Sequence, residues 1–299
     1  MPASGATVTG NPREDAAVVA SPGASTSAPA ALDAPRGAPA AAIGELDDLG
    51  HTVVRGLASP DEVARFRPAL EATADRIAWN RHIPPGQRDT YSNAFLQAIN
   101  LWLVDDVARA FVHSPRFARL ASELLGVDGV RLYHDQALVK EGGGGPTPWH
   151  QDQYYWPIES PATVTMWMPL VDLPDEVGSM TFADGSHRLG DLRGPAISDA
   201  SHEFFERLVE ERGLPCTTHG ALAAGDATFH TGWTLHRAGA NPTSRRRPAM
   251  TVIYVADGAR VGPLVRPEQR ADLELYVPGA QPGDLIATER NPRLWPPSA

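Results

Sequence analysis

Two patterns of apolar and polar residues follow one another along this chain. Between Ser59 and Leu125, apolar side chains recur at helical spacing behind Ser-Pro starts that are typical of helix N-termini. From Val130 onward, short runs rich in β-branched and aromatic residues alternate with glycine and proline, which indicates strands and turns. The pattern predicts helices at residues 59–74, 107–111 and 115–125, and strands at residues 50–55, 130–133, 136–139, 163–168, 179–182, 227–230 and 250–255.

Many short strands separated by turns favour a sandwich or a barrel. We infer a mainly β fold with flanking helices, whose core is a double-stranded β-helix of the jelly-roll or cupin-like type. Residues 1–42 consist mostly of Ala, Pro, Ser, Gly and Thr, and such a segment buries too little apolar surface to offset the entropy cost of ordering. The sequence therefore predicts a disordered extension at 1–42 and one folded domain at 43–299.

Composition excludes some classes of partner. The formal net charge of −10 argues against nucleic acid and anionic membrane surfaces, and no apolar run approaches the roughly 20 residues that span a bilayer. The single cysteine, Cys216, excludes an internal disulfide and fits a reducing, cytoplasmic location. Basic residues are almost all arginine, Lys140 being the one lysine, which together with abundant Ala and Pro suggests a bacterial coding sequence rich in GC.

The candidate chemistry begins at His150 and Asp152, which are separated by one residue. On a strand, side chains two residues apart point to the same face, so both could bind one metal ion. A third ligand could come from His219, His230 or His236 downstream. Two histidines and one carboxylate form the facial triad that is typical of non-haem Fe(II) oxygenases, because it leaves open coordination positions.

Arg247 distinguishes His236 from the other two histidines. It follows His236 by eleven residues, and a guanidinium can pair bidentately with a carboxylate. With Asn241 five residues after His236, this order resembles the phytanoyl-CoA dioxygenase family of Fe(II)/2-oxoglutarate oxygenases. The resemblance runs from about Leu46 onward and includes Tyr133–Gln136, Trp167–Leu170, Gly178–Met180, Gly185–His187 and Gly225–Asp226.

The resemblance implies roles for individual residues. The implied Fe(II) ligands are His150, Asp152 and His236, Arg247 would bind the distal carboxylate of 2-oxoglutarate, and Gln136 and Trp167 would line the cosubstrate site. One departure is Ala238, because some members have serine two residues after the distal histidine.

Three aromatic residues follow the metal motif directly. In the family this segment lies beside the open iron position, so Tyr154, Tyr155 and Trp156 are candidates for an apolar substrate pocket. The implied activity is oxidation, in the first place hydroxylation, of a small molecule that is a bacterial metabolite, with O2 consumed and succinate and CO2 as coproducts. The alternatives are a zinc-dependent hydrolase using the same ligands, or a non-catalytic binding protein of the same fold. The oligomeric state stays open.

Overall fold

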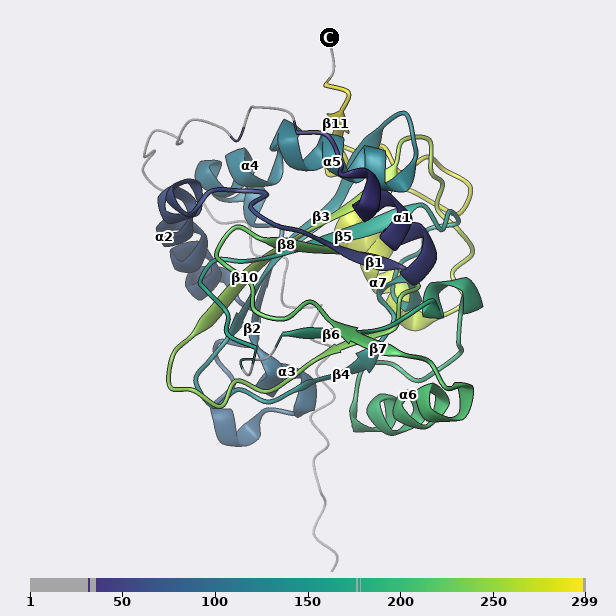
Figure 1. Cartoon of the computed structure of the whole chain (residues 1–299). Helices are drawn as coiled ribbons and strands as arrows, with labels where there is room; N and C mark the ends of the chain where they lie inside the picture. Colours follow the sequence, from purple (N-terminus) through teal and green to yellow (C-terminus); the bar gives the residue numbers. More distant parts are fainter. Residues whose placement is uncertain (1–31, 33–35, 176, 178, 298–299) are drawn as a thin grey trace, which may run out of the picture.

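The computed structural model describes residues 32, 36–175, 177 and 179–297 (Figure 1). Two mostly antiparallel sheets lie one above the other, with helices packed around them. This arrangement confirms the prediction of a mainly β fold with flanking helices. None of the helices in these described ranges has the length and apolar character needed to cross a membrane.

The large sheet has the strand order β1-β8-β5-β10-β3-β11, and β2 also pairs with β3. At its centre, Thr251 of β10 pairs with Gln136 of β3 on one side and with Trp167 of β5 on the other. These three side chains therefore form one row across the sheet. The strands are β1 (His51–Val54), β2 (Leu96–Ile99), β3 (Val130–Lys140), β5 (Thr163–Pro169), β8 (Ala227–Thr231), β10 (Arg247–Ala256) and β11 (Arg293–Trp295).

Helices cover the outer face of the large sheet (Figure 1). Helix α2 begins with a capping box, because the Ser59 hydroxyl accepts from the Glu62 backbone N–H while the Glu62 carboxylate accepts from that of Ser59. Apolar residues on these helices join Met166, Met250 and Val252 of the sheet in one buried cluster. The helices in this layer are α1 (Ala40–Leu49), α2 (Pro60–Ile77), α4 (Asp106–Val112) and α5 (Pro115–Leu125).

The small sheet has the order β4-β9-β6-β7 and faces the inner side of the large one (Figure 1). Helix α6 packs against β4 on its outer side. Helix α3 contacts β2 and β4, and α3 and α7 both contribute residues to the cavity described below. The remaining elements are β4 (Thr147–His150), β6 (Met180–Ala183), β7 (Cys216–Thr218), β9 (His236–Ala238), α3 (Thr90–Ala94), α6 (Asp199–Arg212) and α7 (Pro267–Tyr276).

The N-terminal boundary differs from the prediction. Most of the predicted extension, residues 1–42, lies outside the described residues. Leu32 and Ala42 are nevertheless buried, and α1 begins at Ala40. The Leu32 carbonyl accepts a hydrogen bond from the Ser114 hydroxyl. Residues 40–42 of the predicted extension therefore belong to α1, and Leu32 and Ala42 pack in the buried cluster under the helical layer.

Candidate functional site

The two candidate histidine ligands are neighbours on the small sheet. Strands β4 and β9 pair with His150 opposite His236, and the two ring centroids are 4.1 Å apart. Asp152 does not continue β4 as the sequence suggested, because it opens a short 3-10 helix, η4 (Asp152–Tyr154). Gln151 between them is extended, so His150 and Asp152 still point the same way.

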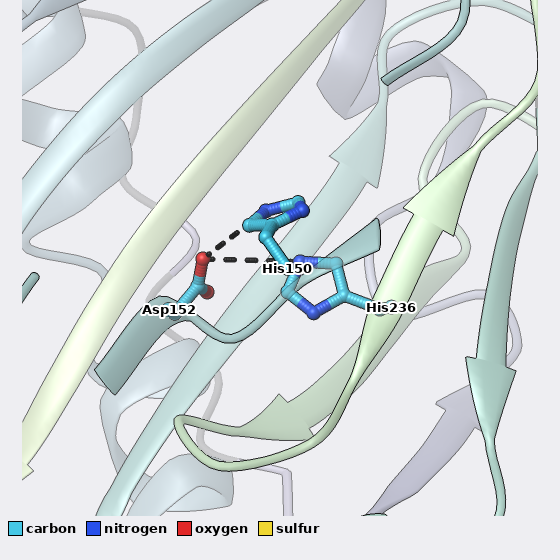
Figure 2. Close-up of side chains that lie close together, drawn as sticks. All are labelled: His150, Asp152 and His236. Atoms are coloured by element: carbon cyan, nitrogen blue, oxygen red, sulfur yellow. Dashed lines mark ion pairs between the residues drawn. The ribbon is translucent and has the colours of Figure 1, made fainter. Parts of the chain in front are cut away.

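The ligand atoms of the three side chains converge (Figure 2). Asp152 Oδ1 lies 3.6 Å from His150 Nε2 and 3.8 Å from His236 Nε2, and the three candidate ligand atoms lie within 4.8 Å of one another. Each Nδ1 is bound instead to a backbone carbonyl, that of Pro148 at 2.8 Å and that of Thr234 at 2.9 Å. Each carbonyl accepts a hydrogen bond from Nδ1–H, which leaves the Nε2 lone pair of each ring for a metal. The donor set therefore fits a facial-triad metal ion.

The protonation states also suit metal binding. Burial, followed by the neighbouring histidine charges, lowers the pKa of both His150 and His236 to about 4. Burial alone would raise the pKa of Asp152, but the surrounding histidines hold it below its usual range. At neutral pH the site therefore offers two neutral imidazoles and one carboxylate.

The second oxygen of Asp152 is held from the large sheet. Asp152 Oδ2 accepts hydrogen bonds from His230 Nε2 at 3.1 Å and from the Thr165 hydroxyl at 3.0 Å. His230, one of the three candidate ligands, thus orients the carboxylate rather than joining the triad. His219, the other candidate, lies apart, where its Nε2 contacts His51 Nδ1 at 3.1 Å.

A buried cation, Arg247, lines the cavity that also contains the triad. Arg247 is 3% exposed, and its guanidinium carbon lies 5.2 Å from the centre of the Trp167 ring. Burial lowers the pKa of Arg247 to about 10, which keeps it charged at neutral pH. Lys140, its register partner on β3, is fully buried, and burial and then the Arg247 charge lower the pKa of Lys140 to about 7. A dicarboxylate that reaches from the triad to Arg247 fits this arrangement.

The neighbours of Arg247 have structural roles. Arg246 turns outward and forms an ion pair with Asp75 on the surface. Asn241, which sequence analysis noted as part of the family pattern, is fully buried and donates to the backbone carbonyls of Glu141 and Arg245. These hydrogen bonds join the loop after β3 to the segment that leads into β10, and so hold the backbone just before Arg247 in place.

A cavity of about 420 Å³ joins these features. The triad, Arg247, Gln136 and Trp167 all line it. Sequence analysis missed the contribution of α7, although the Arg266-Pro267 start could have indicated that helix. Besides Trp167, the aromatic part of the wall consists of Trp79, Tyr91, Phe95, Tyr155, Trp156 and Tyr276.

Tyr154 is the predicted pocket residue that does not reach the cavity wall. Its ring packs against the guanidinium of Arg266, 4.4 Å from the ring centre, and Arg266 pairs with Asp191. The turn of η4 directs Tyr155 and Trp156 inward and Tyr154 to the rim.

The family follows from a comparison with known sequences. The family described as phytanoyl-CoA dioxygenase (PhyH) matches residues 46–249, which include the triad and Arg247. The chain belongs to the phytanoyl-CoA dioxygenase family. A probable alpha-ketoglutarate-dependent hypophosphite dioxygenase from Stutzerimonas stutzeri is 26% identical over 71% of this chain and 77% of its own. An ectoine dioxygenase from Streptomyces coelicolor is 25% identical over 91% of this chain and 92% of its own.

Solved structures agree with this family assignment. The alpha ketoglutarate-dependent epimerase SnoN from nogalamycin biosynthesis is 32% identical, covers 85% of this chain and 97% of its own, and has a TM-score of 0.66. The carbocyclase SnoK from the same biosynthesis has a TM-score of 0.69 at 24% identity over 89% of this chain and 99% of its own, which supports the fold. This member of the family is a non-haem dioxygenase that depends on iron and 2-oxoglutarate (alpha-ketoglutarate).

Proposed function

We propose that this dioxygenase oxidises, and in the first place hydroxylates, a small bacterial metabolite with a large apolar face. One observation carries the proposal: a single cavity joins the triad and Arg247 to an aromatic wall. Such a wall can bind a flat or bulky apolar group and exclude water from the reacting atoms. We further propose that the two sheets form a double-stranded β-helix, and that this single domain holds the whole site.

The proposed roles follow the geometry of the donors. His150 and His236 would bind Fe(II) through Nε2, and Asp152 through Oδ1, while His230 and Thr165 hold the other carboxylate oxygen. Bound iron and 2-oxoglutarate supply the activation of O2, with succinate and CO2 as coproducts. The chain itself contributes binding, orientation and exclusion of water.

Arg247 would fix the far end of the cosubstrate. Its guanidinium is buried over Trp167, so a carboxylate that pairs with it is screened little by water. Gln136 lies in the same row of side chains as Trp167 and would complete the cosubstrate site. Tyr155 and Trp156 would bound the substrate side of the cavity.

A second outcome, epimerisation or ring closure without net addition of oxygen, is favoured by the likeness to SnoN, which is named as an epimerase. The outcomes differ in the product mass, since hydroxylation adds one oxygen atom, oxidative ring closure removes two hydrogen atoms, and epimerisation leaves the mass unchanged. Asp152 occupies the carboxylate position of the triad, which argues against halide binding there and hence against halogenation.

The test uses the full chain with Fe(II), 2-oxoglutarate and pools of bacterial metabolites. Succinate is measured first, and product mass is then measured for each active pool. We expect slow succinate formation without substrate and faster formation with the correct pool, and Asp152→Ala serves as the inactive control. Absence of both 2-oxoglutarate binding and succinate formation in metal-loaded protein would refute the proposal.

A further inference from the structure

A network of hydrogen bonds between side chains ends at Gln136. The Gln97 carbonyl oxygen accepts from Trp79 Nε1 at 2.9 Å and from the Tyr91 hydroxyl at 3.1 Å. The Gln97 amide nitrogen donates to Gln136 Oε1 at 2.6 Å. All four residues line the cavity that holds the metal triad.

The Trp79 indole determines the donor and acceptor at every hydrogen bond of this network. An indole N–H can only donate, so the Gln97 atom that faces Trp79 must be its oxygen. The Gln97 amino group must then face Gln136, and the Gln136 oxygen must face Gln97. Reversing either amide would bring two donors together.

The Gln136 amino group is therefore directed away from Gln97. Among the described residues, no acceptor is hydrogen-bonded to this nitrogen, and Gln136 lines the cavity. Its row neighbours across the sheet are Thr251 and Trp167, and the Arg247 guanidinium lies over the Trp167 ring. Its two N–H donors are thus available to a ligand in the cavity that Arg247 also lines.

We propose that Gln97 is a positioning residue that keeps the Gln136 amide with its donors toward 2-oxoglutarate. A ligand rich in carboxylate oxygens gains from donors and loses if a carbonyl oxygen faces it instead. Trp79 and Tyr91 act through Gln97, and neither contacts Gln136 in this network. This inference rests on the proposed role of Gln136 in the cosubstrate site.

Gln97→Glu is the decisive variant, because it retains the shape and the acceptor but removes the donor. The new carboxylate still accepts from Trp79 and Tyr91, and the Gln136 amide must turn to donate to it. The Gln136 oxygen would then face 2-oxoglutarate. We expect the dissociation constant for 2-oxoglutarate to rise about tenfold or more, on the scale of one hydrogen bond to a charged group. Titration calorimetry of the anaerobic Fe(II) protein measures it.

A double-mutant cycle separates this effect from simple charge repulsion. In a Gln136→Met background there is no amide to turn, so Gln97→Glu should weaken 2-oxoglutarate binding little further. An equally large effect of Gln97→Glu in both backgrounds would overturn the proposal, since repulsion from the added charge would then explain it. Fe(II) affinity and the melting temperature without cosubstrate should stay near those of the wild type in each variant.

Trp79→Phe is a second test that adds no charge. It removes the donor that fixes the Gln97 amide, so both amides can reverse, and we expect a smaller rise in the same dissociation constant. The inference would be overturned if neither Trp79→Phe nor Gln97→Glu raised the dissociation constant for 2-oxoglutarate although Arg247→Met did raise it. Failure of the wild-type protein to bind 2-oxoglutarate would instead refute the proposed function.

Discussion

The two faces of the large sheet differ although the same strands build both. On β10, Met250 and Val252 point outward into the apolar cluster under the helices, while Arg247 and Thr251 line the cavity. On β5, Met166 likewise faces the helices. The outer face stabilises the fold by burying apolar surface, about 1.5–3 kcal/mol for each large side chain. The inner face holds charged and polar groups whose value lies in ligand binding.

Residues that stabilise the fold and residues that line the site therefore occupy adjacent positions on the same strand. Consecutive side chains point to opposite faces, so neighbouring substitutions should have unlike effects. Outer-face changes should lower the free energy of unfolding without altering ligand affinity. Inner-face changes should weaken ligand binding and lower the free energy of unfolding less. The proposed metal ligands come from the small sheet and the turn after β4, and the large sheet orients Asp152.

The largest expected effect is at the metal. His236→Ala removes one of three ligands and should abolish iron-dependent turnover. His230→Ala leaves the ligands in place but removes one of the two hydrogen bonds to Asp152 Oδ2, so metal affinity should fall about 10- to 100-fold. His219→Ala is the control and should leave metal binding unchanged, because it lies apart from the triad. Metal titration under anaerobic conditions measures all three, and an equal loss in His219→Ala would contradict the assignment.

Arg247→Met should greatly weaken 2-oxoglutarate binding and leave iron binding intact. A buried carboxylate left without its charged partner loses about 2–5 kcal/mol, which corresponds to a rise in the 2-oxoglutarate dissociation constant of roughly 30-fold or more. Arg246→Met is the matched control, since Arg246 pairs with Asp75 on the surface. The absorbance of the Fe(II)–cosubstrate complex follows the titration. Equal weakening by both variants would show that the cosubstrate is held elsewhere.

Met250 and Thr251 test the comparison at adjacent positions. Met250→Ala should lower the free energy of unfolding by about 2–5 kcal/mol, because it leaves a cavity under the helices, and cosubstrate affinity should be unchanged. Thr251→Ala should cost about 1 kcal/mol through its lost hydrogen bond to the Gln136 carbonyl, and should weaken cosubstrate binding. Denaturant unfolding and calorimetry give both quantities. The opposite assignment of effects would break the two-face description.

The N-terminal segment on the helical layer should affect stability and not the site. Removing residues 1–39 exposes the site of Leu32 and should lower the free energy of unfolding by about 2 kcal/mol. Removing residues 1–31 retains Leu32 and should cost much less. Turnover should be the same in both truncated proteins, because neither deletion reaches the cavity. A fall in cosubstrate affinity in either would connect this segment to the site.

Local signals predicted several elements closely. Helix α5 begins and ends at the residues expected, 115 and 125, because a Ser-Pro start and a following glycine mark its ends. The strong β run at 163–168 is β5 with one residue added. Helix α6 and the strand β2 were not predicted, since their short apolar patterns match several local structures equally well.

The strand β3 shows where local reasoning fails. The sequence suggested two strands, but β3 is continuous, and its pairing with β10 shifts register between Ile253 and Tyr254. Across this irregularity Leu132 packs in the apolar cluster while His134 lines the cavity, although simple alternation would place them on one face. A bulge reverses the facing of every residue beyond it, and its position depends on the partner strand.

The sequence by itself determined the residue types of the site, namely two histidines, a carboxylate and a distant arginine in a distinctive order. It also determined the starts of α2 and α5 and most of β5, because capping and periodicity involve residues only a few positions apart. Only the tertiary structure decided that His230 holds Asp152, that Tyr154 turns to the rim, and that Gln97 directs Gln136. Those roles depend on the register between strands and turns far apart in the chain, and no local spacing specifies that register.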